Sequence, residues 1–241
     1  MKTRKINTMS FLTMLIGCSL WLSCATDVLT GQTVKETRNL PAFNALKLTM
    51  SADVYLSQGD HQSLQVEADK GSLEYIETET NGNTLVVRNR EGHWQNLGHI
   101  KIYITMPDIS EIELSGSGSV ESQTPIRAAE LKIGLSGSGN VKISSLQAPK
   151  LSATITGSGD IYLSGDNDQA EMDATITGSG SIKADEMRVA NATIHITGSG
   201  SARVNVLKEL ETDITGSGSV HYKGNPIINA HSTGSGRTTA L

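Results

Sequence analysis

A hydroxyl residue followed by Gly-Ser-Gly occurs seven times in the second half of this 241-residue chain. Successive copies lie 21, 20, 21, 20, 18 and 18 residues apart. A regular period of about 20 residues is typical of a solenoid, in which each repeat buries its apolar face only against its neighbours. The first glycines of the copies are Gly116, Gly137, Gly157, Gly178, Gly198, Gly216 and Gly234.

The residues that flank each copy alternate between apolar and polar. This alternation, rich in β-branched residues, indicates strands and not helices. Parallel strands joined in series are connected by right-handed crossovers in nearly all proteins. We therefore predict an all-β fold, a right-handed parallel β-helix (solenoid) with about 20 residues per coil. The apolar residues two positions before the first glycine are Leu114, Leu135, Ile155, Ile176, Ile196 and Ile214, and Ser232 takes this place in the last copy.

The same alternation predicts where the side chains of each copy point. If the apolar neighbours point inward, both glycines point inward as well, and the hydroxyl side chains point outward. Stacked coils would then align these hydroxyls into two exposed columns. The candidate ladder consists of Thr156, Ser158, Thr177, Ser179, Thr197, Ser199, Thr215 and Ser217.

The first half of the chain shows a weaker form of the same pattern. Residues 49–56 match residues 156–163, with Met50 and Ala52 in place of the two glycines, which predicts a degenerate eighth copy. Asn81-Gly82 predicts a hairpin with a type I′ turn. We interpret residues 39–110 as irregular coils with a hairpin that caps the N-terminal end of the repeat β-helix, residues 111–241. A separate β-sandwich domain at residues 39–108 is the alternative.

The N-terminus has the features of a targeting segment. Lys2, Arg4 and Lys5 precede an apolar run that extends to Leu22 and is too short for a mature membrane span. The segment resembles a bacterial lipoprotein signal, in which a cysteine at the end of the run is lipidated. Residues 1–23 are predicted to be the signal peptide and residues 24–38 a polar tether. The predicted lipidation site is Cys24, which follows a full-length run, and the alternative is Cys18, which has the better match to the usual lipobox.

Charge limits the classes of partner. Without Lys2, Arg4 and Lys5, 17 basic residues face 25 acidic ones, a net charge of −8. An acidic chain without a basic patch is not expected to bind nucleic acid, and it would be repelled by anionic membrane surfaces. Membrane association is therefore expected through the N-terminal lipid, with the protein exported and anchored to the cell envelope, at the outer membrane.

We find no sequence motif for a catalytic nucleophile, a phosphate loop or a metal site, and we predict no catalytic, metal or cofactor residues. The stretch Asp166-Asn167-Asp168 lacks a further carboxylate at a diagnostic spacing, so we interpret it as a solvated turn and not a calcium loop. A polysaccharide-processing enzyme would need charged residues clustered across neighbouring coils. We interpret Asp160, Lys183 and Arg203 as isolated, so that such an enzyme is only the alternative function.

Several segments together resemble the bacterial head GIN domain family of auto-transporter adhesins. They are residues 38–46, the hairpin arm at residues 82–85 and the Gly-Ser-Gly repeats, and the resemblance covers residues 37–240. It implies a lipidated or secreted β-helical envelope protein, often from Bacteroidetes, and supplies no catalytic residues. The expected function is a non-enzymatic adhesin or binding scaffold that presents the Ser/Thr ladder. The partner would be a surface protein or glycan, and self-association through one end of the β-helix is also expected to be feasible.

Overall fold

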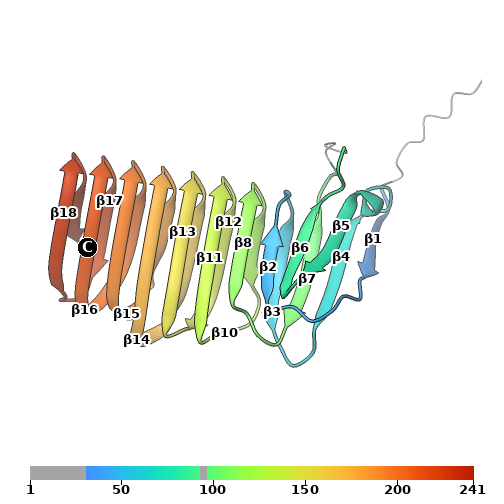
Figure 1. Cartoon of the computed structure of the whole chain (residues 1–241), viewed down its shortest axis with the longest axis horizontal. Coiled ribbons are helices and arrows are strands. Elements are labelled where there is room, and N and C mark those ends of the chain that lie inside the picture. The colour runs from blue at the N-terminus through green and yellow to red at the C-terminus, as the bar shows by residue number, and fades with distance from the viewer. Residues whose placement is uncertain (1–30, 93–96) are drawn as a thin grey trace, which may run out of the picture. The chain divides into compact units, whose positions relative to one another are not determined.

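The computed structural model describes residues 31–92 and 97–241 (Figure 1). The predicted signal peptide, Cys18, Cys24 and the first part of the predicted tether lie outside these residues. The described chain is almost entirely strand and forms a β-solenoid, as the repeat period predicts. Its one helical element is a 3₁₀ turn, η1 (Leu73–Tyr75). No helix in these residues is long and apolar enough to cross a membrane.

The strands that lead into the Gly-Ser-Gly phrases form the first stack. All neighbours pair in parallel except β5 and β6, which form an antiparallel hairpin. Residues 171–178, 191–198 and 209–216, which belong to this stack, are the C-terminal parts of longer strands that bend between stacks. In spatial order the stack contains β5 (Ile76–Asn81), β6 (Thr84–Asn89), β2 (Ala45–Leu48), β8 (Glu111–Gly116), β11 (Glu130–Gly137), β13 (Lys150–Gly157), β14 (Asp160–Gly178), β15 (Ser181–Gly198), β16 (Ser201–Gly216) and β18 (Ile227–Gly234).

The strands that follow the phrases form the second stack. Its first two pairings, β1 with β4 and β4 with β7, are antiparallel, and the others are parallel. The N-terminal parts of β14, β15 and β16 belong to this stack. In spatial order the other members are β1 (Thr33–Thr37), β4 (Ser63–Asp69), β7 (Lys101–Met106), β3 (Asp53–Gln58), β9 (Ser119–Ser122), β12 (Asn140–Gln147), β17 (Ser219–Lys223) and β19 (Arg237–Ala240).

A third and much shorter run of pairings closes the coils from residue 126 onward. It begins at β10 (Ile126–Arg127), which pairs with the end of β12, and continues through the middle of β14 and β15. The inward side chains of all three runs form one continuous apolar core of Leu, Ile, Val, Met and Ala. Because the coils before the last one share this core and each coil hydrogen-bonds to its neighbours, no coil would be stable alone.

Each Gly-Ser-Gly phrase forms the corner between the first and second stacks. The first glycines have φ values between 115° and 131°, which L side chains rarely adopt. The second glycine is buried in the first six copies, as predicted, whereas the first glycine lies half-buried at the bend. The glycines of the phrase therefore allow the chain to turn at the corner and the coils to stack closely there.

The predicted eighth copy is confirmed, but its position does not follow chain order. Strands β2 and β3 form a coil directly beside β8 and β9, and Met50 and Ala52 stack on Gly116 and Gly118. The coil made by β6 and β7 lies on the other side of β2 and β3. These pairings place residues 39–110 within the solenoid, so the β-sandwich alternative is wrong.

Two local expectations need correction. Strand β1 (Thr33–Thr37) lies within the segment predicted to be a tether, and it pairs with β4 because Val34 packs against the core. The hairpin between β5 and β6 is present, but Asn81 pairs with Thr84, so Gly82 and Asn83 form the turn. Only Gly82 of these two has a positive φ, at 59°, which fits a type II′ turn and not type I′.

Candidate functional site

All eight residues of the predicted ladder are exposed, in two columns along the corner between the first and second stacks. Strand register places Thr156 beside Thr177, Thr177 beside Thr197, and Thr197 beside Thr215. Neighbouring strands in a sheet lie about 4.8 Å apart, so the threonine column repeats at this distance.

The serine column is fixed through its backbone. The N–H of Ser179 donates to the carbonyl of Gly157, and the N–H groups of Ser199 and Ser217 donate to the first glycines of the coils before them, each at 2.9 Å. Within the described residues, the hydroxyls of the eight ladder residues have no protein hydrogen-bond partner. The backbone of the serine column is therefore held by hydrogen bonds between coils, and the side chains of both columns face solvent.

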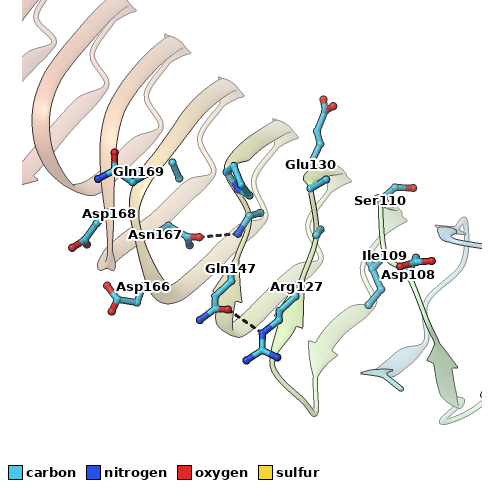
Figure 2. Close-up of a pocket in the computed structure, with 15 residues that line it drawn as sticks. Asp108, Ile109, Ser110, Arg127, Glu130, Gln147, Asp166, Asn167, Asp168 and Gln169 are labelled. Atoms are coloured by element: carbon cyan, nitrogen blue, oxygen red, sulfur yellow. Dashed lines mark hydrogen bonds between the residues drawn. The ribbon is translucent and has the colours of Figure 1, made fainter. Parts of the chain in front are cut away.

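A groove of about 880 Å³ lies at another corner, where each coil turns back into the first stack (Figure 2). Its apolar lining consists of Ile109 and of small residues, Ala128, Ala129, Ala148, Pro149 and Ala170. Figure 2 shows Gln169 and Asp168 toward one end of the groove and Asp108 and Ser110 toward the other. The sequence analysis did not predict this groove, because small residues at a turn carry no pattern of their own.

A local insertion shapes one end of the groove. Register pairs Asn167 with Val189 and Glu171 with Asn191, so three residues of β14, at positions 168–170, face one residue of β15. The extra residues form a bulge, which bends the strand. The bulge, at residues 168–170, thus forms one end of the groove.

Asn167 anchors the bulge from inside. Its side chain is buried, its Oδ1 accepts a hydrogen bond from the N–H of Ala148, and its Nδ2 donates to the carbonyl of Leu146, both at 2.7 Å. The side-chain amide thus satisfies backbone groups of the neighbouring coil. The sequence analysis interpreted Asn167 as part of a solvated turn, and this is wrong for Asn167.

The acidic neighbours of Asn167 are held by an arginine of the next coil. Arg188 Nη2 lies 2.7 Å from Asp166 Oδ1, and Arg188 Nε lies 3.0 Å from Asp168 Oδ1. The hydrogen bond and the positive charge of Arg188 lower the pKa of Asp166 below its ordinary value. In the described part of the chain, no group of three or more His, Cys, Asp or Glu residues is placed to hold a metal ion.

A second charged cluster lies on the second stack and corrects the interpretation of isolated charges. Lys183 Nζ lies 3.1 Å from Asp160 Oδ2 and 3.0 Å from the hydroxyl of Tyr162, which donates to Asp160 Oδ2 at 2.9 Å. The lysine also lies over the Tyr162 ring, 4.4 Å from its centroid. Asp160 and Lys183 are therefore paired across two coils.

The ionisation of this cluster follows from its contacts. Burial alone would raise the pKa of Asp160, but the hydrogen bonds from Tyr162 and Lys183 and the lysine charge outweigh it and lower the pKa. The pKa of Lys183 is raised, mainly by its hydrogen bond to Tyr162 and also by Asp160. Both groups are therefore charged at neutral pH and neutralise each other.

The fold and these surfaces define a class of protein: a β-solenoid that exposes regular polar columns along one corner. A family model described as "Putative auto-transporter adhesin, head GIN domain" matches residues 42–226. Because the match covers more than half of the chain, the protein belongs to this head GIN domain family. No curated protein matches the chain.

Solved structures from Bacteroidetes share the fold over nearly their whole length. A "putative adhesin" from Bacteroides fragilis is 25% identical with a TM-score of 0.83, and the match covers 88% of this chain and 99% of that one. A "putative lipid binding protein" from Parabacteroides distasonis is 26% identical with a TM-score of 0.71, over 88% and 98% of the two chains. A "putative adhesin" from Parabacteroides merdae, at 23% identity and a TM-score of 0.71 over 88% and 97%, shows the fold alone.

Proposed function

We propose that this protein is a non-enzymatic, adhesin-like binding protein of the cell envelope. It is exported and held at the outer membrane by a lipid on Cys24, with Cys18 as the alternative site. Family membership supports the adhesin-like role, and the apolar N-terminal run that ends at these cysteines supports the anchor. One protein that carries several acyl chains would be anchored stably, even though its acidic body is repelled by anionic lipids.

The observation that carries the proposal is the exposed ladder. Its hydroxyls have no protein partner within residues 31–92 and 97–241, and its backbone is fixed by hydrogen bonds between coils. A pre-ordered surface loses little conformational entropy when a ligand binds. Hydroxyls that both donate and accept hydrogen bonds suit the hydroxyl-rich surface of a glycan or the polar surface of a protein.

The alternative, a polysaccharide-processing enzyme, has one observation in its favour, the cluster of Asp160, Tyr162 and Lys183. Glycoside hydrolysis needs two carboxyl groups on either side of the scissile bond. In this cluster the single carboxylate accepts hydrogen bonds from both neighbours, which suits a structural ion pair better. The adhesin-like role is therefore the function that the surface supports best.

A binding screen tests the proposal. Residues 31–241 would be immobilised and exposed to host glycans, extracellular matrix proteins and envelope fractions. We expect saturable binding to at least one class of ligand. The absence of saturable binding to every class, with the β-sheet circular dichroism spectrum intact, would contradict the proposal. Reproducible cleavage of any polysaccharide in the panel would favour the enzyme.

A further inference from the structure

The last coil of the solenoid has an open edge. In the described residues β18 pairs only with β16, and β19 pairs only with β17, so the outer edges of both strands have no neighbouring strand. Their outward backbone N–H and C=O groups are therefore free to pair with another strand. All eight residues of β18 are exposed. The last coil is also visible as the uncovered end of the solenoid in Figure 1.

The same end carries the large hydrophobic side chains that the described chain exposes. They belong to the last two coils, and Ile227, with 76% of its surface exposed, is the most exposed of them. Ile227 points outward from β18, in register with Glu209 of the coil before it. Exposed apolar groups that gather beside a free strand edge are typical of an interaction surface. The four side chains are Leu207, Ile227, Ile228 and Leu241.

Charge distinguishes this end from the rest of the molecule. Residues 224–241 contain no Asp or Glu, and Arg237 is their only Lys or Arg, although the whole chain carries 25 acidic and 20 basic residues. Strand β18 also lacks the lysines and the internal proline with which proteins ordinarily block free edges. Two copies of this acidic protein would repel each other along their sides, but not through this end.

The opposite end is built differently. There the antiparallel strands β1, β4 and β5 lie beyond the parallel coils. Their outward side chains form ion pairs, such as Lys35 with Glu67 at 3.2 Å and Arg88 with Glu77 at 3.1 Å. The N-terminal end is thus covered by strands that carry ion pairs, whereas residues 224–241 carry a single charged side chain, Arg237, and expose large hydrophobic ones.

We propose that the C-terminal coil is a dimerisation surface, on which β18 of one copy pairs antiparallel with β18 of a second copy. The two copies would be related by a two-fold axis, so that the same patch serves both partners. Backbone hydrogen bonds across the β18 edges would give the pairing its geometry, as in other strand-addition interfaces. Burial of Ile227 and Ile228 from both copies would supply its apolar contact. The dimer would hold two ladders on one rigid rod of double length.

Sedimentation equilibrium of residues 31–241 tests this inference, since solved relatives match 88% of this chain over 98% or more of their own length. We expect a reversible monomer–dimer equilibrium for the wild type. Ile227→Lys should raise the dissociation constant about tenfold or more, because the new charge cannot be buried without cost. The variant should fold, because Ile227 is exposed and neighbours Glu209.

The matched control is Asn191→Lys, which places the same charge in the same column but two coils away from the edge. It should dimerise like the wild type. Asn229→Lys, also on β18, is a second edge variant and should weaken the dimer in the same way. Amide hydrogen exchange should show protection of β18 in the wild-type dimer and its loss in both edge variants.

Three results would overturn the inference. One is a wild type that stays monomeric at every concentration at which it is soluble. Another is a dimer that folded Ile227→Lys and Asn229→Lys leave unchanged. The third is a dimer in which the β18 amides exchange as fast as in the edge variants. Folding of the variants is established separately by circular dichroism.

Discussion

The carbonyl oxygen of Gly137 lies 2.5 Å from the position that a Cβ atom on Gly157 would occupy. The same relationship joins Gly157 to Gly178 and recurs along the solenoid, because each corner stacks directly on the corner before it. At Gly116 the nearest atom to such a Cβ is the Met50 carbonyl oxygen, at 3.6 Å, which is an ordinary contact. The stacking on the glycine-free copy is therefore looser at Gly116, whereas a Cβ on Gly118 would overlap the Ala52 carbonyl oxygen.

Replacing the glycine at a tight corner should destabilise the fold. Gly157→Ala places a Cβ against the Gly137 backbone and forces alanine to adopt a φ of 127°. We expect a loss of about 2 to 4 kcal/mol in the free energy of unfolding, from strain and steric overlap together. Urea denaturation followed by circular dichroism measures it.

Gly134→Ala is the control for this prediction. It lies on β11, one coil earlier, and its added Cβ would meet only the Glu113 side chain, at 3.7 Å. Alanine in a strand loses less entropy on folding than glycine, so this variant should be as stable as the wild type or more stable by about 0.5 kcal/mol. Equal losses in the two variants would show that corner stacking is not the cause.

Asn167→Ala should destabilise the bulge beside the groove. It leaves the Ala148 N–H and the Leu146 carbonyl without their partners in a buried place, at an expected cost of about 2 to 4 kcal/mol. Gln169→Ala, on the same bulge but exposed, should change stability by no more than about 0.5 kcal/mol. Hydrogen exchange should also show faster exchange of the Ala148 amide in Asn167→Ala. If the Asn167→Ala variant is as stable as the Gln169→Ala variant, Asn167 does not anchor the bulge.

The ion pair between Asp160 and Lys183 should make stability depend on pH. The pKa of Asp160 lies below its ordinary value of 3.8, so the folded state binds the proton less tightly than the unfolded state. The stabilising effect is therefore complete above the ordinary pKa and is lost as the pH falls through the lowered one. The pKa of Lys183 lies above its ordinary value of 10.5, so its contribution is complete below that value and is lost as the pH rises through the raised one.

Asp160→Asn checks this assignment. At neutral pH the variant should be less stable by about 0.2 to 1 kcal/mol, since the pair is partly exposed. The difference should shrink as the pH falls below about 4, where the wild-type carboxylate begins to lose its advantage. A difference that stays constant from pH 7 to pH 2 would exclude the carboxylate charge as its source.

The lipid anchor is testable by mass spectrometry of the protein from its native membrane. We expect acyl chains on Cys24, with Cys24→Ser leaving the full chain unprocessed and Cys18→Ser leaving acylation intact. The reverse pattern would assign the anchor to Cys18. Acylation of the double variant, in which both Cys18 and Cys24 are replaced by Ser, would contradict a cysteine-linked anchor.

The part of the fold that can be predicted from the sequence is the part that the repeat determines. Alternation around Ile155 and Ile176 defines strand direction, inward face and register, because equivalent positions of successive copies become neighbours. The place of β6 and β7 beyond β2 and β3 could not be predicted, since pairing order in that region depends on contacts between segments without the repeat. Strand β1 was missed because Val34 is its only apolar residue, too little for a periodicity signal.

The site was predictable where it follows the repeat and not where it departs from it. The exposure of Thr177 and Ser179 follows directly from strand alternation. The pairing of Asp160 with Lys183 was missed because the two residues occupy different columns, and only a long side chain reaches diagonally between coils. The buried position of Asn167 depends on an insertion in one coil, which alignment on the glycines does not reveal.

The measurement that tests the central claim most directly is the affinity of ladder variants for the ligand found by the binding screen. In one variant, Thr177, Thr197 and Thr215 all become Val, which keeps the branched shape and removes only the hydroxyls. The control variant carries Gln169→Ala at the groove. We predict that the ladder variant binds at least about tenfold more weakly, as expected for the loss of several hydrogen bonds, while the groove variant binds like the wild type. Unchanged affinity in a folded ladder variant, or a loss confined to the groove variant, would contradict the proposal that this adhesin-like protein binds through its Ser/Thr ladder.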